Sequence, residues 1–468
     1  MLFSSMLFLW LFLPVVFISY RLIGDKYKNS LLLIASLLFY SWGEPKYIIL
    51  MIISVIINYL SGLLVERADN KRKKLFFVAL CIILNLSLLG YFKYFDFFAQ
   101  NVNRLFGSTV VPIRNVVLPI GISFYTFQAL SYVVDVYRGQ TAAQKSFFKL
   151  LLYVSFFPQL IAGPIVKYHD VEDQINNRTI DVEKTAYGVK RFVYGLSKKV
   201  ILSNTFALTV DNILGKDVDE LGTAVIWFAM LLYSLQIYFD FSGYSDMAIG
   251  IGKMFGFDFL ENFNYPYVAY SVQDFWRRWH ISLSTWFKEY LYIPLGGNRK
   301  GNFRTYVNLL IVFFCTGFWH GASFNFIAWG LYFGFFLILE RLFLGKLLQK
   351  PCFKWLGHIY TLIVVIFGWV MFRANGLRHA LQLMKKMVIP SAGATPLSQF
   401  VDVKLLVILA FGIVFAGLAQ TIFKKLHAGL YNETKVYVCE SVILAVLLFM
   451  CILMLVNNSY NPFIYFRF

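Results

Sequence analysis

The segment SVQDFWRRWHISLSTWFKEY, residues 271–290, gathers three tryptophans, two adjacent arginines and a histidine in a strongly apolar chain. Ser271 followed by Asp274 is typical of a helix N-terminus, so we predict one helix beginning near residue 272. Helical spacing would then align polar side chains in one stripe, formed by Gln273, Arg277, His280, Ser284 and Lys288, beside a mostly aromatic face. A helix at the membrane interface would explain the aromatic and basic residues. It would not explain a titratable imidazole in the middle of the stripe.

The composition identifies the solvent. Of the 468 residues, 59% are hydrophobic and only 15% are charged, whereas a soluble domain has about 25% charged residues. Mean hydropathy is +0.64, and phenylalanine alone occurs 50 times. A soluble fold could not bury so much apolar surface, so we predict an all-α polytopic integral membrane protein.

Apolar runs long enough to cross a hydrocarbon core of about 30 Å occur throughout the chain. They cover about 2–20, 29–43, 46–65, 75–92, 220–239, 305–319, 326–345, 355–372, 404–423 and 437–456. Two more runs, 116–137 and 148–168, are broken by proline, glycine and polar residues, which favours tilted, re-entrant or internally packed segments. We therefore expect about ten to twelve membrane helices, with re-entrant and interfacial helices in addition. We also expect one membrane-embedded domain over 1–468, with a functional middle at 116–330 between simple helical flanks.

The net charge of +18 comes from 43 lysines and arginines against 25 acidic residues. Basic residues gather in short loops such as 21–29 and 65–74, as the positive-inside rule expects, and no nucleic-acid-binding module recurs. We therefore expect no nucleic-acid partner and place these loops in the cytoplasm. With the two lysines in TIFKKLH (421–427) also inside, both termini would lie outside the cytoplasm. The basic loop 373–403 should then lie outside, where it would follow the interface as an amphipathic segment.

The five cysteines are scattered without CxxC or Cys/His spacing, so neither a disulfide framework nor a metal site is expected. The N-terminal stretch lacks a basic leading region and a small-residue cleavage site, so it is interpreted as a retained membrane span.

A second polar feature is TGFWHGASFNFIAWG (316–330), in which His320 ends an apolar run between Gly317 and Gly321. An ionisable group in membrane-embedded sequence is costly and is by default a functional hypothesis. The alternative is a neutral, buried histidine that donates to a backbone carbonyl and only packs. The glycines would allow close backbone approach or a break in the helix.

Other polar residues of the middle region have two interpretations. Asp240 and Asp246 in YFDFSGYSDMAIG (238–250) could cap a restarted helix, or bind a cation or substrate. The prolines and glycine of FPQLIAGPIVKYHD (157–170) favour a segment buried in protein or lining a cavity. We expect the four remaining histidines to be exposed, namely His169, His358, His379 and His427.

These residues also carry a family resemblance. RRWHISLSTW (277–286) with FWHG (318–321) resembles the membrane-bound O-acyltransferase superfamily, in the branch of the alginate O-acetyltransferase membrane subunit. LPIGISFYTFQALSYVVDVYRG (118–139), the two segments at 157–168 and 238–248, and the closing FIYFRF support this resemblance. It implies a ring of helices around a central tunnel, with His320 as the catalytic histidine and His280 as the second active-site histidine.

The resemblance further implies an acyl group taken from a cytoplasmic thioester, either acetyl-CoA or an acyl carrier protein. The acyl group would be passed across the membrane to a polysaccharide, through an extracytoplasmic SGNH-type acetyltransferase partner. A related group transfers D-alanine to teichoic acids, but LYIPLGGNRKG (291–301) is closer to the acetyl-transfer branch. In this interpretation His320 is the general base, and His280 orients the reactants or stabilises the oxyanion.

Neither a metal nor a bound cofactor is expected for this reaction. Membrane lipids surround the protein, and the donor funnel or tunnel would include Arg277, Ser284, Lys288, Trp276 and Asp240. A different class of function stays open: a transporter or flippase for lipid-linked sugars, with His280, His320 and Asp240 as proton-relay groups. A scaffold in an exopolysaccharide export complex is a third alternative.

Overall fold

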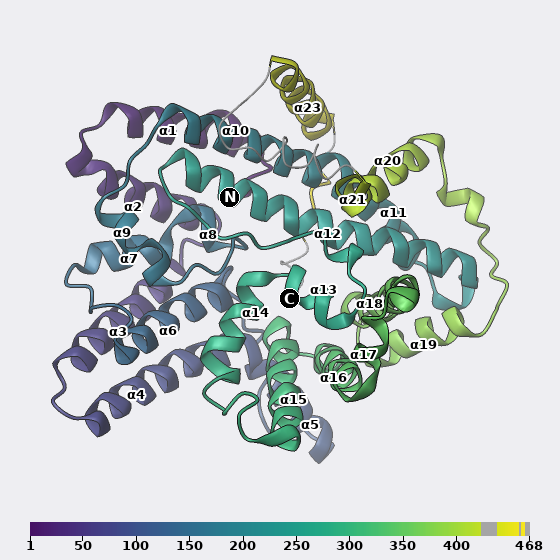
Figure 1. Cartoon of the computed structure of the whole chain (residues 1–468), viewed down its shortest axis with the longest axis horizontal. Helices are drawn as coiled ribbons and strands as arrows, with labels where there is room; N and C mark the ends of the chain where they lie inside the picture. Colours follow the sequence, from purple (N-terminus) through teal and green to yellow (C-terminus); the bar gives the residue numbers. More distant parts are fainter. Residues whose placement is uncertain (423–437, 458–459, 464–468) are drawn as a thin grey trace. The chain divides into compact units, whose positions relative to one another are not determined.

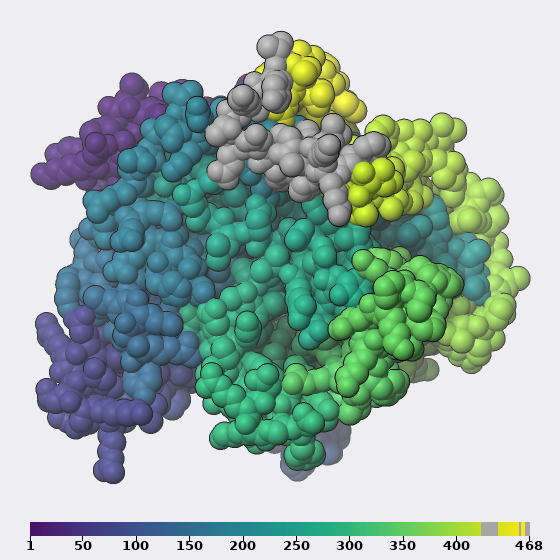
Figure 2. Space-filling model, viewed as in Figure 1, coloured from purple at the N-terminus to yellow at the C-terminus, as the bar shows by residue number. Residues whose placement is uncertain are grey.

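The computed structural model describes residues 1–422, 438–457 and 460–463, which form helices and no β-strand (Figure 1). The chain divides into two compact units. The first comprises Met1–Phe192 with Met247–Leu260, and the second comprises Val193–Asp246 with Glu261–Phe468. Within the described parts of these units, side chains fill most of the gaps between the ribbons (Figure 2).

The first unit contains the N-terminal helices. In chain order they are η1 (Phe8–Phe12), α1 (Leu13–Leu22), α2 (Asp25–Ser41), α3 (Ile48–Arg67), α4 (Lys71–Leu89), η2 (Gly90–Tyr94), α5 (Phe95–Phe106), α6 (Ile122–Arg138), α7 (Phe147–Ser155), α8 (Phe157–Leu160) and α9 (Tyr168–Asn176). Helix α10 (Val182–Ser197) begins in this unit and ends in the second.

A buried polar cluster joins α3 to α4. The amide of Asn58 donates to Oδ1 of Asn85 at 3.0 Å, and the hydroxyl of Ser54 donates to the same oxygen at 3.0 Å. Hydrogen bonds of this kind associate membrane helices, because apolar side chains gain little by leaving lipid for one another. The cluster therefore fixes how these two apolar helices pack.

The second unit begins after α10. Its described helices are η3 (Lys198–Ser203), α11 (Asn204–Leu214), η4 (Val218–Glu220), α12 (Thr223–Met254, whose last residues belong to the first unit), η5 (Pro266–Val268), α13 (Val272–Arg278), α14 (Ile281–Phe287), η6 (Lys288–Tyr292), α15 (Gly301–His320), α16 (Phe324–Leu339), η7 (Glu340–Leu344), α17 (Gly345–Leu348), η8 (Pro351–Phe353), α18 (Lys354–Arg373), α19 (Leu377–Val388), η9 (Leu397–Phe400), α20 (Val403–Ile413), η10 (Val414–Leu418), α21 (Ala419–Ile422) and α23 (Val438–Asn457).

Seven helical segments in the described part of the chain are long and apolar enough to cross a membrane. They are Ile48–Arg67, Lys71–Phe106, Thr223–Met254, Phe324–Leu348, Pro351–Arg373, Val403–Ile422 and Cys439–Asn457, and Phe8–Leu22 is a shorter apolar helix. The chain is therefore an all-α, multi-pass membrane protein, as the sequence predicts, although the described part has fewer such segments than the ten to twelve membrane helices expected.

The two broken apolar runs do not form simple spans. Helix α6 starts only at Ile122, and nearly all of its residues are buried. The run at 148–168 is divided into α7 and the short α8, and its residues are almost wholly buried as well. Both segments pack inside protein, which confirms one of the predicted alternatives.

Helices α15 and α16 form a tight antiparallel pair (Figure 1). Their backbones meet at glycines, because a Cβ on Gly317 would lie 2.2 Å from the carbonyl oxygen of Phe326, and one on Gly330 would lie 2.1 Å from that of Phe313. Any larger residue would push the helices apart. This contact fixes the end of α15, where His320 is located.

Candidate active site

The segment 271–290 forms two helices instead of one, and they are joined at His280. Helix α13 begins where predicted: the hydroxyl of Ser271 accepts the N–H of Asp274 at 3.0 Å. It ends at Arg278, and His280 adopts φ 46° and ψ 55° before α14 begins. Positive φ is uncommon for a residue other than glycine and is often found at functional sites. The predicted continuous polar stripe is therefore wrong, because the break turns His280 away from it.

A buried glutamate reinforces the start of α13. The carboxylate of Glu340, from η7, accepts the N–H of Val272 at 2.6 Å and the N–H of Gln273 at 2.9 Å. These are two of the four amide groups that a helix N-terminus leaves without internal partners, and a negative charge there is also favoured by the helix dipole. Sequence reasoning missed this contact, although a lone glutamate after the apolar run of α16 was a usable signal.

The side chain of Asn262 holds His280 in place. Oδ1 of Asn262 accepts the backbone N–H of Ser282 at 3.2 Å and the Ser282 hydroxyl at 2.9 Å, and it lies 3.2 Å from Nδ1 of His280. Nδ2 of Asn262 donates to the hydroxyl of Ser245 at 3.2 Å. A backbone N–H can only donate, so the amide orientation is fixed and Nδ1 of His280 must carry the hydrogen.

The other nitrogen of His280 is consequently a lone-pair acceptor. Only 1% of the residue is exposed, and its Nε2 has no hydrogen-bond partner among the described residues. His280 lies outside the seven segments that are long and apolar enough to cross a membrane. Burial lowers the pKa of His280 to about 3, so the imidazole is neutral. Phe241 packs edge-on against the ring, with centroids 4.6 Å apart. The site therefore offers one buried, neutral and oriented hydrogen-bond acceptor.

His320 is the last residue of α15, and the extended backbone of Gly321 ends the helix there. The imidazole packs against Trp319, Trp329 and Phe372, with ring centroids 5.0, 5.1 and 5.1 Å away. Trp319 also faces His280, at a centroid distance of 6.3 Å. The structure thus brings the two predicted histidines into one aromatic cluster, in which the Trp319 ring contacts both.

The other predicted residues of this segment lie in different surroundings. Trp276 is buried and packs against Trp329, with centroids 5.6 Å apart. Ser284 is half-buried, and its hydroxyl donates to the carbonyl of Trp276 at 3.4 Å. Arg277 and Lys288 are exposed. Of these four expected funnel residues, only Trp276 therefore packs into the aromatic cluster around His280 and His320.

Asp240 and Asp246 lie in the middle of an uninterrupted α12, so the expected restarted helix is wrong. Each carboxylate has a lysine of η3 as its partner: Asp240 lies 2.6 Å from Nζ of Lys199, and Asp246 lies 2.6 Å from Nζ of Lys198. Lys199 also donates to the backbone carbonyl of Pro462. The cations near these acids are thus side chains of the chain itself, and they hold α12 against η3.

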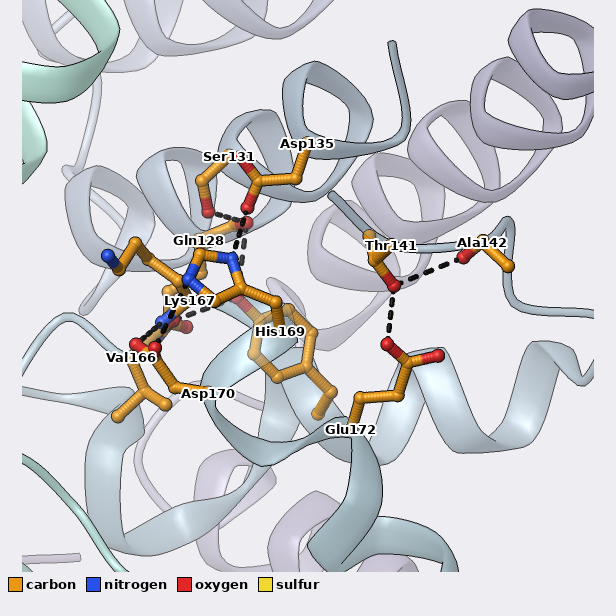
Figure 3. A network of polar contacts seen from close by, with 11 residues as sticks. Gln128, Ser131, Asp135, Thr141, Ala142, Val166, Lys167, His169, Asp170 and Glu172 are labelled. Carbon is orange, nitrogen blue, oxygen red and sulfur yellow. Dashed lines mark hydrogen bonds and ion pairs between the residues drawn. The ribbon is translucent and has the colours of Figure 1, made fainter. Parts of the chain in front are cut away.

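A second polar network lies in the first unit and joins two of the quoted motifs (Figure 3). Nδ1 of His169 lies 2.9 Å from Oδ2 of Asp135, and Nε2 lies 3.2 Å from Oδ1 of Asp170. Nearby, the hydroxyl of Thr141 donates to Glu172 at 2.5 Å. Asp135 is fully buried, and the side chain of His169 is 29% exposed. The expectation of an exposed His169 is therefore wrong, because α6 supplies a buried carboxylate as its partner.

Two other histidines are half-buried instead of exposed. Nδ1 of His358 donates to the carbonyl of Ala269 at 3.1 Å, and Nδ1 of His379 accepts the N–H of Asn375 at 3.1 Å. His427, the two lysines of TIFKKLH, and residues 464–468 of FIYFRF lie outside the described residues. In the described part, no group of three or more His, Cys, Asp or Glu side chains could hold a metal ion.

Comparison with known proteins gives consistent matches. The sequence model of the membrane-bound O-acyltransferase family matches residues 75–383. The probable alginate O-acetylase AlgI of Pseudomonas putida is 41% identical over the full length of both chains. The peptidoglycan O-acetyltransferase of Helicobacter pylori is 40% identical, over 83% of this chain and 80% of its own. The teichoic acid D-alanyltransferase of Bacillus subtilis is 28% identical, over 57% of this chain and 72% of its own.

Proposed function

We propose that this chain, which belongs to the membrane-bound O-acyltransferase family, acetylates a polysaccharide from a cytoplasmic thioester donor. The chain is a multi-pass membrane O-acyltransferase. Relatives named for O-acetyl transfer to alginate and to peptidoglycan match at 40–41% identity over most of the chain. The relative named for D-alanyl transfer matches at 28% over a shorter part, which favours acetyl as the group transferred.

One structural observation carries the proposal: His280 is neutral, buried and held with Nε2 as an acceptor, in the aromatic cluster that contains His320. Acyl transfer from a thioester needs groups that accept and orient a proton at a place protected from water. The contact with Asn262 holds the ring through one nitrogen and leaves Nε2 available to a reactant.

The proposed reaction is a direct transfer. His320 takes the proton of the acceptor hydroxyl while the hydroxyl oxygen attacks the thioester carbonyl. The carbon–sulfur bond then breaks, and His320 passes the proton to the leaving thiolate. His280 orients the reactants by accepting a hydrogen bond at Nε2. Of the two roles predicted for His280, the fixed tautomer favours orientation, because a neutral acceptor nitrogen has no hydrogen to donate to an oxyanion. The tryptophans around both rings keep water out.

The donor and the partner are parts of the same proposal. Acetyl-CoA and an acetylated carrier protein both carry phosphate, so the exposed Arg277 and Lys288 would attract either one. Trp276 and Ser284 would stabilise the tunnel wall by packing against its aromatic residues and by the hydrogen bond between them. The hydroxyl that is acetylated at this site would belong to an extracytoplasmic SGNH-type acetyltransferase, which then passes the acetyl group to the polysaccharide.

The proposed orientation places the basic loops 21–29 and 65–74 in the cytoplasm and both termini outside. The basic stretch 341–354, between α16 and α18, fits the same side. Single cysteines at Asn70 and Asn375, introduced after replacing the exposed Cys352 and Cys439, should react with an impermeant thiol reagent from opposite sides of intact cells. Labelling of both from one side would contradict this orientation.

The decisive test of function uses the purified chain in proteoliposomes that also hold the extracytoplasmic partner and an acceptor polysaccharide. Radiolabelled acetyl-CoA, an acetylated carrier protein and a D-alanylated carrier protein are supplied as donors in parallel. We expect donor-dependent release of free thiol and transfer of label from one of the acetyl donors. His320→Ala should reduce the rate by about 10²–10⁴-fold, the usual contribution of a general base. Absence of thioester turnover with all three donors, together with movement of lipid-linked sugar, would establish the transporter instead.

A further inference from the structure

A cavity of about 410 Å³ lies in the second unit, separate from the two histidine rings. Its walls come from the segment 264–270, from α13, from the start of α18 and from η10 with α21. Arg278, Lys354 and His358 bring basic side chains to it, and Asp274 brings one acid. No residue of this cavity has been used in the proposed reaction.

The cavity depends on a kink in the wall formed by η10. Gly417 has φ 144°, a value that side-chain-bearing residues rarely adopt, and a Cβ there would lie 2.4 Å from Cγ1 of Val268. The hydroxyl of Thr421 donates to the carbonyl of Gly417 at 2.8 Å, which satisfies a backbone group at the kink. The wall is therefore a defined piece of structure.

The charges of the cavity do not cancel. Nε of Arg278 donates to Oδ1 of Asp274 at 3.0 Å, and Nη1 donates to the carbonyl of Asn264 at 3.3 Å, so this pair is neutral overall. Lys354 lies over Tyr270, with Nζ 5.5 Å from the ring centroid, and makes no ion pair in the described part of the chain. Its charge is thus left over, so the arginine and lysine of the described lining carry one positive charge more than its aspartate.

The donors that line the cavity suit an oxyanion. Nη2 of Arg278 is without a hydrogen-bond partner among the described residues, and Lys354 has three N–H donors. Nδ1 of His358 is committed to the carbonyl of Ala269. Guanidinium and ammonium groups together favour phosphate or carboxylate, and a phosphate in a diester carries the single negative charge that balances the site.

We propose that this cavity binds a phosphate ester group. Two sources have this chemistry: the head group of an anionic membrane phospholipid, and the pantetheine phosphate of the thioester donor. Lys354 belongs to the basic stretch 341–354, which the proposed orientation places on the cytoplasmic side, where both occur. The donor alternative rests on the proposed function, whereas the lipid alternative does not.

The cavity is linked to the catalytic segment through the backbone. The N–H of Asn264 donates to the carbonyl of Arg278 at 2.9 Å, and the N–H of Ile281 donates to the carbonyl of Asn262 at 3.0 Å. The stretch 262–264, which fixes His280, thus continues directly into the cavity wall. A phosphate bound to Arg278 would therefore be connected, through the backbone of residues 262–264, to the side chain of Asn262 that orients His280.

The test measures ligand binding in the full-length protein, so a variant without enzyme activity can still be compared. Lys354→Gln and Arg278→Gln are compared with Lys350→Gln and Arg341→Gln, which remove the same charge from exposed positions outside the cavity. Retention of phosphatidylglycerol is measured by native mass spectrometry, and binding of coenzyme A by equilibrium dialysis. Loss of one charge-assisted hydrogen bond should weaken binding by about tenfold or more.

Each outcome decides between the alternatives. A loss of phosphatidylglycerol alone identifies a lipid site, a loss of coenzyme A alone identifies a donor site, and a loss of both shows that the cavity accepts either phosphate ester. Arg278→Gln breaks the contact with Asp274 and could disturb folding. In that case Lys354→Gln decides, because its ammonium makes no ion pair in the described residues. Unchanged binding of both probes in Lys354→Gln would overturn the proposal.

Discussion

His280 and His169 are both partly or fully buried and both are held by polar side chains, but their ring nitrogens differ. Each nitrogen of His169 faces a carboxylate oxygen, at 2.9 and 3.2 Å. In His280, Nδ1 is committed to Asn262, and Nε2 has no hydrogen-bond partner in the described residues. One ring is saturated by its partners, while the other keeps a reactive position open.

The difference shows how the same residue type can serve structure or chemistry. A saturated imidazole joins segments, as His169 joins α6 to α9, and has no atom left for a reactant. An imidazole fixed through one nitrogen is held in orientation and still offers the other, which is the arrangement expected of a general base or positioning acceptor. Burial alone does not distinguish the two cases.

Among the variants that test this comparison of His280 with His169, a change at His280 should have the largest effect. Asparagine tolerates the left-handed conformation found there, so His280→Asn should fold, but its shorter side chain has no acceptor atom at the place of Nε2. Acetyl transfer should fall by about 10²-fold or more, because the reactants lose a group that orients them, measured as turnover per folded molecule in proteoliposomes. His169→Gln, the matched variant in the first unit, should leave that turnover unchanged. Equal losses in both variants would remove the functional distinction between the two histidines.

The next effect concerns Asn262, which contacts no reactant in the proposed reaction and acts through His280. In Asn262→Ala the imidazole loses the partner that selects its tautomer, and a lost hydrogen bond of this kind corresponds to roughly 10–100-fold in rate. The loss should appear in kcat with KM nearly unchanged, because positioning for the reaction fails while donor binding does not.

Asn262→Asp separates positioning from a general loss of packing. A carboxylate still accepts from His280 and Ser282, so activity should partly return at high pH. The negative charge would raise the pKa of His280, and the neutral acceptor form would then be lost as pH falls through that higher pKa. The acid limb of the pH–rate profile should therefore move to higher pH. A variant whose profile keeps its shape while its thermal stability drops would show that Asn262 has only a structural role.

The roles assigned to His280 and His320 rest on the family resemblance and stay predictions. Sequence reasoning predicted most of the apolar helices, because apolar runs are local signals. The start of α13 at Ser271 is such a signal. Sequence reasoning did not predict the backbone break at His280, because the positive φ there accompanies a tertiary contact with Asn262. The partners of Asp240 and His169 were missed for the same reason: tertiary contacts decide what a buried charge faces.

The smallest expected effect on chemistry comes from Asp135, the buried partner of His169. Asp135→Asn keeps the size of the side chain and an acceptor oxygen but removes the charge that faces the imidazole, and a hydrogen bond to a charged group contributes about 1 kcal/mol more than a neutral one. We therefore expect a lower thermal unfolding midpoint with turnover unchanged at permissive temperature. Asp170→Asn is the matched control, because Asp170 is 20% exposed and water can replace its contact, so its midpoint should fall less. If Asp135→Asn abolished acetyl transfer at unchanged stability, the saturated histidine would be part of the reaction, and open ring nitrogens would no longer mark the reactive site in this fold.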